Sequence, residues 1–300
     1  MVNEHTIFDW KVEAINLIKE YFESIGIKYS PKENVHKCLI DFMNLEMKLI
    51  KPAPRIIYKS SELKSRVIPL KYVSALNYIE NKIRTGADLT YHLSKKTLDP
   101  SYNDLLLNDW IIRHFHISEA KSQQGQKFYD RSKYLLFALF SETQAILIDI
   151  REHHEENLFA KKELLEIIDN NWPNVLKVHE HEDAVFLHNQ YSDADIDLLR
   201  RKGYTIGTTE VNGKIIINPG IGITTSGHNL HVVKRANEIM RYIQESLMEI
   251  DKDFEGMKKS LSKEVGFKIN DLDICIHKID KWPFFAVHEN NSKIYIEKTY

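Results

Sequence analysis

The chain has 300 residues, of which 43% are hydrophobic and 28% are charged, which is the balance of an ordinary globular protein. Its 41 Lys and Arg residues against 43 Asp and Glu residues leave a net charge of −2, so overall charge indicates no partner. Cys38 and Cys275 are isolated, which excludes a disulfide framework and a thiolate zinc site and fits a reducing cytosol. The longest apolar run, 134–140, falls short of the ~20 residues of a membrane helix. We therefore expect a cytoplasmic protein with no membrane partner.

The first ninety residues are predicted to be helical, because apolar residues recur there at spacings of three and four. The first helix carries Phe8 and Phe22 in one stripe and ends near Gly26. Ser30, followed by Pro31 and Glu33, predicts the start of a second helix that runs toward Pro52. A third helix is expected over 72–84, before Gly86.

The rest of the chain mixes strands and helices. Strands are expected over 111–117, 134–140 and 145–150, the last two joined by a hairpin, and a helix over 159–171. In the last third, Ser192 opens a short helix, Asn212-Gly213 turns a second hairpin, and a long helix precedes three closing strands. That long helix is expected over 230–257, and the closing strands over 273–279, 284–288 and 293–297. The prediction is an α+β protein with a helical N-terminal region (1–90), a small antiparallel sheet core (91–185) and a C-terminal α+β region (186–300).

Histidines near the expected sheet are the main candidates for chemistry. His114 and His116 flank Phe115 on one strand, so alternation puts both rings on one face, about 7 Å apart at ~3.3 Å per residue. His153 and His154 follow the end of another strand, and a meander would bring all four to one end of the sheet. The nearby charged residues are Arg113, Asp130, Arg131, Lys133 and Arg151.

Three interpretations of this group are open. Converging histidines and cations can cleave RNA without a metal, because one imidazole takes the 2′-OH proton, another protonates the departing 5′-oxygen, and the cations stabilise the charge on phosphorus. The pair His114 and His116 can also ligate a metal together with Asp130 or Asp149. The third interpretation is structural, with one imidazole packed under an aromatic ring and the others facing water.

The segment Trp110-Ile-Ile-Arg113-His-Phe-His116-Ile117 resembles a strand of the RelE-type mRNA endonuclease toxins, in particular their histidine-dependent branch. Tyr134-Leu-Leu-Phe137 and His154 with Leu158-Phe159 are similar to later segments of that family. The resemblance covers about seventy residues, and the Ser118–Ser132 loop is longer than in the family. It implies RNA as the partner, with ribosome-associated mRNA as the expected substrate, and a cognate antitoxin or immunity protein. The run LLNDW-x-x-x-H-x-H, with the later NNWP, also resembles bacterial accessory-genome proteins.

Two further segments contain residue types that can bind an anion or a metal ion. The glycine-rich stretch 218–228 can hold an anion through backbone N–H groups, or it is a turn that needs positive φ. Its candidate anion-binding residues are Gly220, Gly222, Gly227 and His228. The tract His179-Glu-His-Glu-Asp183 has the residue types of a metal site, but its acidity favours an exposed loop.

The leading hypothesis is a metal-independent endoribonuclease with no cofactor and a toxin-like or phage-defence role. His114 or His116 acts as base, His153 or His154 as acid, and Arg113 and Arg131 contact phosphate. One alternative is a metal-dependent hydrolase. The other is a non-catalytic module whose basic stretch 45–84, with nine Lys/Arg against three Glu, docks a protein or nucleic acid. That stretch can equally be a solvated face.

Overall fold

A computed structural model describes residues 9–31, 34–120, 127–180, 191–266, 268, 272–279, 283–289 and 295–298. The chain forms two compact units. We name them by their place in the sequence: the central unit is the middle of the chain, residues 44–232, and the outer unit combines its two ends, residues 1–43 and 233–300. The α+β class is confirmed. The division differs from the three consecutive regions expected from the sequence, because the two ends of the chain share one unit.

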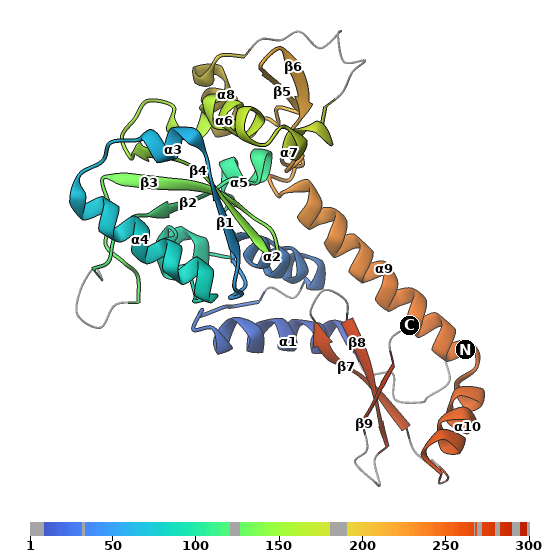
Figure 1. Ribbon diagram of the computed structural model, residues 1–300. Helices are drawn as coiled ribbons and strands as arrows, with labels where there is room; N and C mark the ends of the chain where they lie inside the picture. The colour runs from blue at the N-terminus through green and yellow to red at the C-terminus, as the bar shows by residue number, and fades with distance from the viewer. Residues whose placement is uncertain are drawn as a thin grey trace. The chain divides into compact units, whose positions relative to one another are not determined.

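The central unit is built on a four-stranded sheet in the order β1-β4-β3-β2 (Figure 1). Its strands are β1 (Ile56–Lys59), β2 (Arg113–His116), β3 (Tyr134–Phe140) and β4 (Gln144–Glu152). The expected meander is confirmed, since β3 pairs antiparallel with both β2 and β4. The sequence analysis missed β1, which pairs parallel with β4 and lies within a region predicted to be helical.

Apolar residues of β3 are buried on both faces of the sheet, as a continuous apolar run predicts. Leu135 and Phe137 belong to a core that includes residues of α6, whereas Leu136 and Ala138 belong to a core that includes residues of α4. The helices of this unit are α3 (Ser61–Ser65), α4 (Leu70–Thr85), α5 (Leu105–Trp110), α6 (Glu163–Asn171), α7 (Pro173–Lys177) and α8 (Asp193–Arg201). Its 3-10 turns are η1 (Thr90–His92), η2 (Lys95–Leu98) and η3 (Leu158–Ala160).

A hairpin and a capped helix complete the central unit. The strands β5 (Thr208–Val211) and β6 (Lys214–Ile217) turn at Asn212 and Gly213, whose φ angles of 49° and 77° confirm the predicted turn. The helix α8 begins with a capping box, in which Ser192 and Asp195 bond each other's backbone N–H groups, so the expected helix start is also confirmed.

A buried ion pair joins α5 to α8. Arg200 Nε lies 2.5 Å from Asp109 Oδ2, with 4% and 5% of the two side chains exposed. The same guanidinium lies 4.2 Å from the centre of the Trp110 ring and donates to the Phe159 carbonyl at 2.5 Å. Both charges are therefore compensated inside the core.

In its described residues, the outer unit combines helices with a three-stranded antiparallel sheet in the order β7-β8-β9. Its elements are α1 (Trp10–Ser24), α2 (Val35–Lys48), α9 (Leu230–Lys252), α10 (Phe254–Val265), β7 (Leu272–Ile279), β8 (Pro283–Glu289) and β9 (Tyr295–Lys298). The expected start at Ser30 is wrong, because the Asn34 side chain accepts from Lys37 N and α2 begins at Val35. The long C-terminal helix is interrupted at Asp253, which caps α10. No helix in the described part of the chain has the length and apolarity needed to cross a bilayer.

Candidate functional site

Three of the four histidines predicted to converge meet at one end of the central sheet. His116 lies in the last position of β2, opposite Leu135, and His153 and His154 follow the end of β4. The His116 and His153 rings have centroids 5.7 Å apart at an interplanar angle of 23°, and the His153 and His154 rings lie 5.0 Å apart. The His153 N–H donates to the Lys133 carbonyl at 2.6 Å. We call His116, His153 and His154 the histidine cluster.

Burial and positive neighbours keep part of the cluster neutral. His116 is 5% exposed, and the Ser132 N–H lies 3.4 Å from its Nδ1. Burial, followed by the charges of His114, His153 and Arg131, lowers the pKa of His116 to about 4. Burial also lowers the pKa of the half-buried His153, with His154 and Arg131 adding to the effect. Both rings are uncharged at neutral pH and can accept a proton.

His114 is on the same face of β2, but it is packed against aromatic rings. Its ring lies 4.9 Å from the Phe159 ring and 6.4 Å from the Phe137 ring. Its Nδ1 is 3.7 Å from Asp104 Oδ2, which is longer than a hydrogen bond. His114 therefore fits the structural interpretation, in which an imidazole packs against an aromatic ring.

Two of the four predicted cations are near the cluster. Arg131 is exposed and lowers the pKa of both His116 and His153 through its charge. Lys133 is also exposed and lies 3.1 Å from Glu152 Oε1. A polyanion can displace such an exposed pair at little cost, because surface ion pairs contribute about 0–1 kcal/mol.

The other two cations do not serve the cluster. Arg113 precedes His114 on β2 and so belongs to the opposite face, where it donates to the Met47 carbonyl at 2.7 Å. Arg151 is buried and is bound by three carboxylates, which are those of Asp149, Glu155 and Glu163. The prediction that Arg113 and Arg151 contact phosphate is wrong on this geometry.

The predicted carboxylates do not join the histidines. The Asp130 N–H donates to the Ala120 carbonyl, and its side chain has no ion pair within the described ranges. Both oxygens of the buried Asp149 accept from arginines, namely Arg66 and Arg151. Among the residues that the structure describes, no three His, Cys, Asp or Glu side chains are grouped as a metal ion requires. Of the tract 179–183, residues 181–183 lie outside the described residues.

The glycine-rich stretch 218–228 is a turn and not an anion site. The N–H groups of Gly220, Gly222 and Gly227 donate to the backbone carbonyls of Asp109, Asn108 and Thr224. The His228 carbonyl accepts from the Thr224 N–H and hydroxyl. The three glycine N–H groups already hold the turn and fix it to the end of α5, which favours the turn interpretation over the anion-binding loop.

The basic stretch 45–84 carries cations that are already paired. Glu80 is 2% exposed and accepts from Lys59 at 2.7 Å and from Arg84 at 2.9 Å. Arg66 is bound to Asp149. These contacts favour the interpretation in which the stretch is a structural face of the sheet and its helices.

Sequence reasoning missed a second buried histidine. His92 in η1 is fully buried and stacks on Tyr129 with centroids 3.8 Å apart at 12°. Lys82 Nζ lies 3.3 Å from its Nε2. Burial, followed by the charge of Lys82, lowers the pKa of His92 to about 3. No spacing in the sequence connects these residues, which meet only because α4 and η1 pack together.

Fold and site together define an α+β protein with a histidine cluster at the end of its central sheet. Comparison with protein-family models, with curated proteins and with solved structures finds no match for this chain. The resemblance to RelE-type toxins therefore stays a prediction.

Proposed function

We propose that the protein is a metal-independent endoribonuclease whose reaction takes place at the histidine cluster. The observation that carries the proposal is the approach of His116, His153 and His154 beside the exposed Arg131. A neutral imidazole at His153, with a second histidine and an exposed cation beside it, is suited to proton transfer at a phosphodiester. No carboxylate is needed in this scheme, which agrees with the placement of Asp130 and Asp149.

The reaction is an internal transfer at phosphorus. His153 removes the proton of the ribose 2′-OH while the 2′-oxygen attacks phosphorus. The bond from phosphorus to the 5′-oxygen breaks, and the imidazolium form of His154 donates the proton that this oxygen takes up, which leaves His154 neutral and His153 protonated. The products are a 2′,3′-cyclic phosphate and a 5′-hydroxyl. Arg131 neutralises the additional negative charge on the phosphoryl oxygens in the transition state.

His116 is a positioning residue in this scheme. Its ring is almost fully buried and lies against the His153 ring, so it limits the orientations that His153 can adopt. A cytoplasmic location, action on ribosome-associated mRNA, a toxin-like or phage-defence role and a cognate antitoxin or immunity protein belong to the same proposal. They rest on the resemblance of residues from about 101 to 160 to RelE-type toxins.

The test is cleavage of a defined single-stranded RNA in EDTA, with product ends identified by mass spectrometry. We expect cyclic phosphate ends from the unaltered protein and a loss of about 10²–10⁴-fold for His153→Gln and for His154→Gln. His116→Gln should also slow cleavage and should change its pH profile. The exposed His231, remote in the sequence, provides the matched control His231→Gln, which should leave the rate unchanged. Cleavage that requires a divalent metal, or full activity in both His153→Gln and His154→Gln, would refute the proposal.

A further inference from the structure

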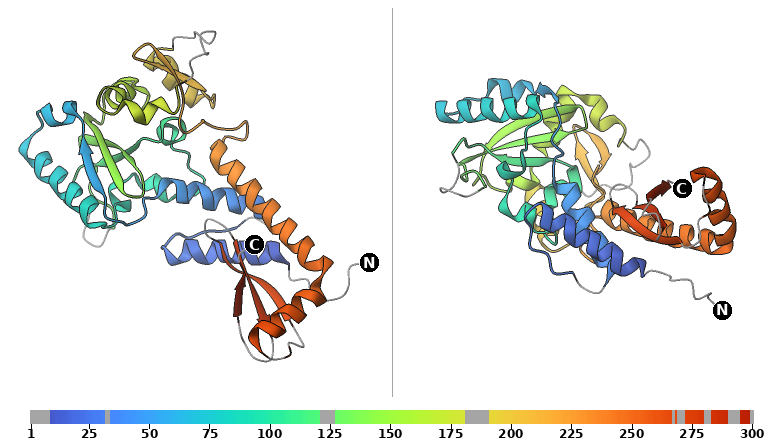
Figure 2. Two further views of the ribbon diagram at one scale, coloured as in Figure 1. Left: turned by 45° about the vertical axis from the view of Figure 1, so that its right-hand side comes forward. Right: turned by 90° about the horizontal axis from the view of Figure 1, so that it is seen from below.

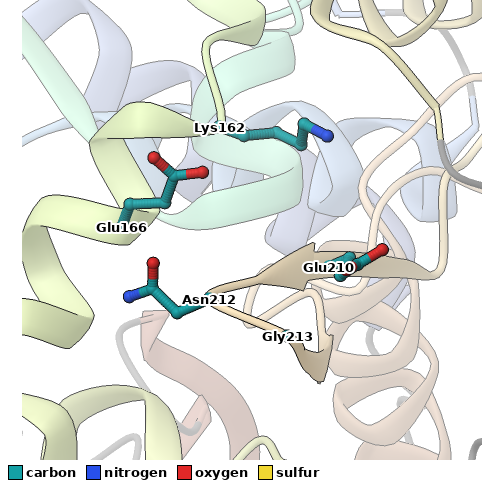
Figure 3. Close-up of a pocket in the computed structure, with 5 residues that line it drawn as sticks. All are labelled: Lys162, Glu166, Glu210, Asn212 and Gly213. Carbon is teal, nitrogen blue, oxygen red and sulfur yellow. The ribbon is translucent and has the colours of Figure 1, made fainter.

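A polar cavity separate from the histidine cluster lies between the start of α6 and the β5–β6 hairpin. Its volume is about 380 Å³, and it is lined by Lys162, Glu166, Glu210, Asn212 and Gly213 (Figure 3). This volume lies in the lower part of the ~300–1,000 Å³ range of small-molecule sites. The cavity therefore fits a ligand of modest size.

Three charged side chains of the cavity are left without a charged partner. Lys162 and Glu166 are four residues apart at the start of α6, a spacing at which opposite charges commonly pair, yet they form no ion pair. Within the described part of the chain, Lys162, Glu166 and Glu210 have no ion pair or side-chain hydrogen bond. Figure 3 shows them arranged around the cavity and not joined to one another.

Neighbouring charges in the same segment behave differently. Lys161 pairs with Glu155 at 2.8 Å, and Glu163 pairs with Arg151 at 2.6 Å. The two charges that flank Lys162 are therefore paired, whereas Lys162 itself and Glu166 are not. The unpaired side chains line the cavity, where a ligand can supply their partners.

The amide of Asn212 adds a fixed acceptor. Its Nδ2 donates to Asp169 Oδ2 at 2.9 Å and to Asn170 Oδ1 at 3.0 Å, both at the end of α6. This pairing leaves the carbonyl oxygen on the side of Glu166, as Figure 3 shows. The hairpin turn, which requires φ of 49° at Asn212, therefore holds an acceptor in the cavity wall.

We propose that this cavity binds a free basic amino acid, arginine or lysine. Two carboxylates and one ammonium give the cavity a net charge of −1, and these amino acids carry one carboxylate and two cations. The ligand carboxylate pairs with Lys162, and its two cations pair with Glu166 and Glu210. Asn212 accepts a further hydrogen bond from one of the cations.

The test is isothermal titration of the full-length protein with L-arginine and with L-lysine at low salt. Agmatine, which lacks the carboxylate, and L-citrulline, which lacks the side-chain charge, serve as ligand controls. We expect saturable binding of arginine or lysine and at least tenfold weaker binding of both controls. Lys162→Met and Glu210→Gln should each weaken binding at least tenfold. The exposed Lys202 and Glu156 provide the matched variants Lys202→Met and Glu156→Gln, which should bind normally.

Thermal unfolding without ligand checks that each variant folds, and a variant that does not fold is replaced by Glu166→Gln. Binding of agmatine as tight as that of arginine, normal binding in folded Lys162→Met, or no binding of either amino acid overturns the proposal. RNA cleavage is measured on the same samples. Amino-acid binding then tests the cavity, and RNA cleavage tests the histidine cluster, independently of each other.

Discussion

Replacing Arg200 with methionine should strongly destabilise the protein. The substitution leaves Asp109, 5% exposed, without the guanidinium that lies 2.5 Å away. It also removes the bond to the Phe159 carbonyl and the contact with the Trp110 ring. Removing one member of a buried ion pair costs about 3–5 kcal/mol, because the other charge stays buried without compensation. We therefore expect the free energy of unfolding to fall by about 3–5 kcal/mol at pH 7.

The loss should depend on pH in a defined direction. Burial raises the pKa of Asp109 even beside Arg200, and without Arg200 that pKa rises further above its unfolded value. Such a carboxyl binds more protons in the folded protein, so stability increases as pH falls through the folded pKa. The destabilisation by Arg200→Met should accordingly be smaller at pH 5 than at pH 7, relative to the unaltered protein at each pH.

Urea unfolding followed by circular dichroism measures both effects. Adding Asp109→Asn to Arg200→Met removes the uncompensated charge and should restore at least about 1 kcal/mol of the loss, within the 0.5–3 kcal/mol usual for contacting residues. A loss below about 1 kcal/mol for Arg200→Met, or strict additivity of the two substitutions, would show that the pair does not support the core as argued.

Three other outcomes follow from the same contacts. Burial lowers the pKa of His116 from 6.5 to about 4, so the contribution of this histidine to stability is complete above pH 6.5 and is lost as pH falls toward 4. We expect the free energy of unfolding, measured by urea titration, to fall by about 3 kcal/mol between pH 7.5 and 4 because of this group. In His116→Gln the decrease over the same pH range should be smaller. Gly220→Ala should destabilise by about 1–3 kcal/mol, since an added Cβ would lie 2.2 Å from the Asn108 carbonyl oxygen, and an unchanged Tm would contradict this contact. Ser60→Ala should cost about 1–2 kcal/mol in chemical denaturation, because the buried hydroxyl caps α3 and donates to the Ile148 carbonyl at 2.5 Å; a neutral result would argue against the cap.

The sequence predicted correctly those elements whose formation depends on residues close together in the chain. The continuous apolar run gave β3 its bounds at Tyr134 and Phe140, and Asn212-Gly213 gave the hairpin turn. The strand β1 was missed because its four residues pair with β4, which begins at Gln144, far along the chain. No window of sequence around β1 contains that partner.

The candidate site was predicted in part. The meander was expected from the strands, and with it the meeting of His116 with His153. The error over Arg113 was avoidable, because alternation along β2 already puts it on the face opposite His114. The pairing of Arg151 with three carboxylates could not be predicted from the sequence. It depends on how the chain folds after β4, which brings Glu155 and Glu163 to the guanidinium that already contacts Asp149.

The outer unit has a consequence for synthesis, because it is assembled from both ends of the chain. The helix α1 buries Ala14, Ile18 and Phe22, and it lies beside β7, which is made near the end of translation. The ribosome must add the 189 residues from 44 to 232 before the second part of that unit begins to appear. At about 5–20 residues per second this delay is roughly 10–40 s. During this delay the face of α1 that packs beside β7 lacks that partner, so the nascent chain exposes apolar surface until its last residues have been made.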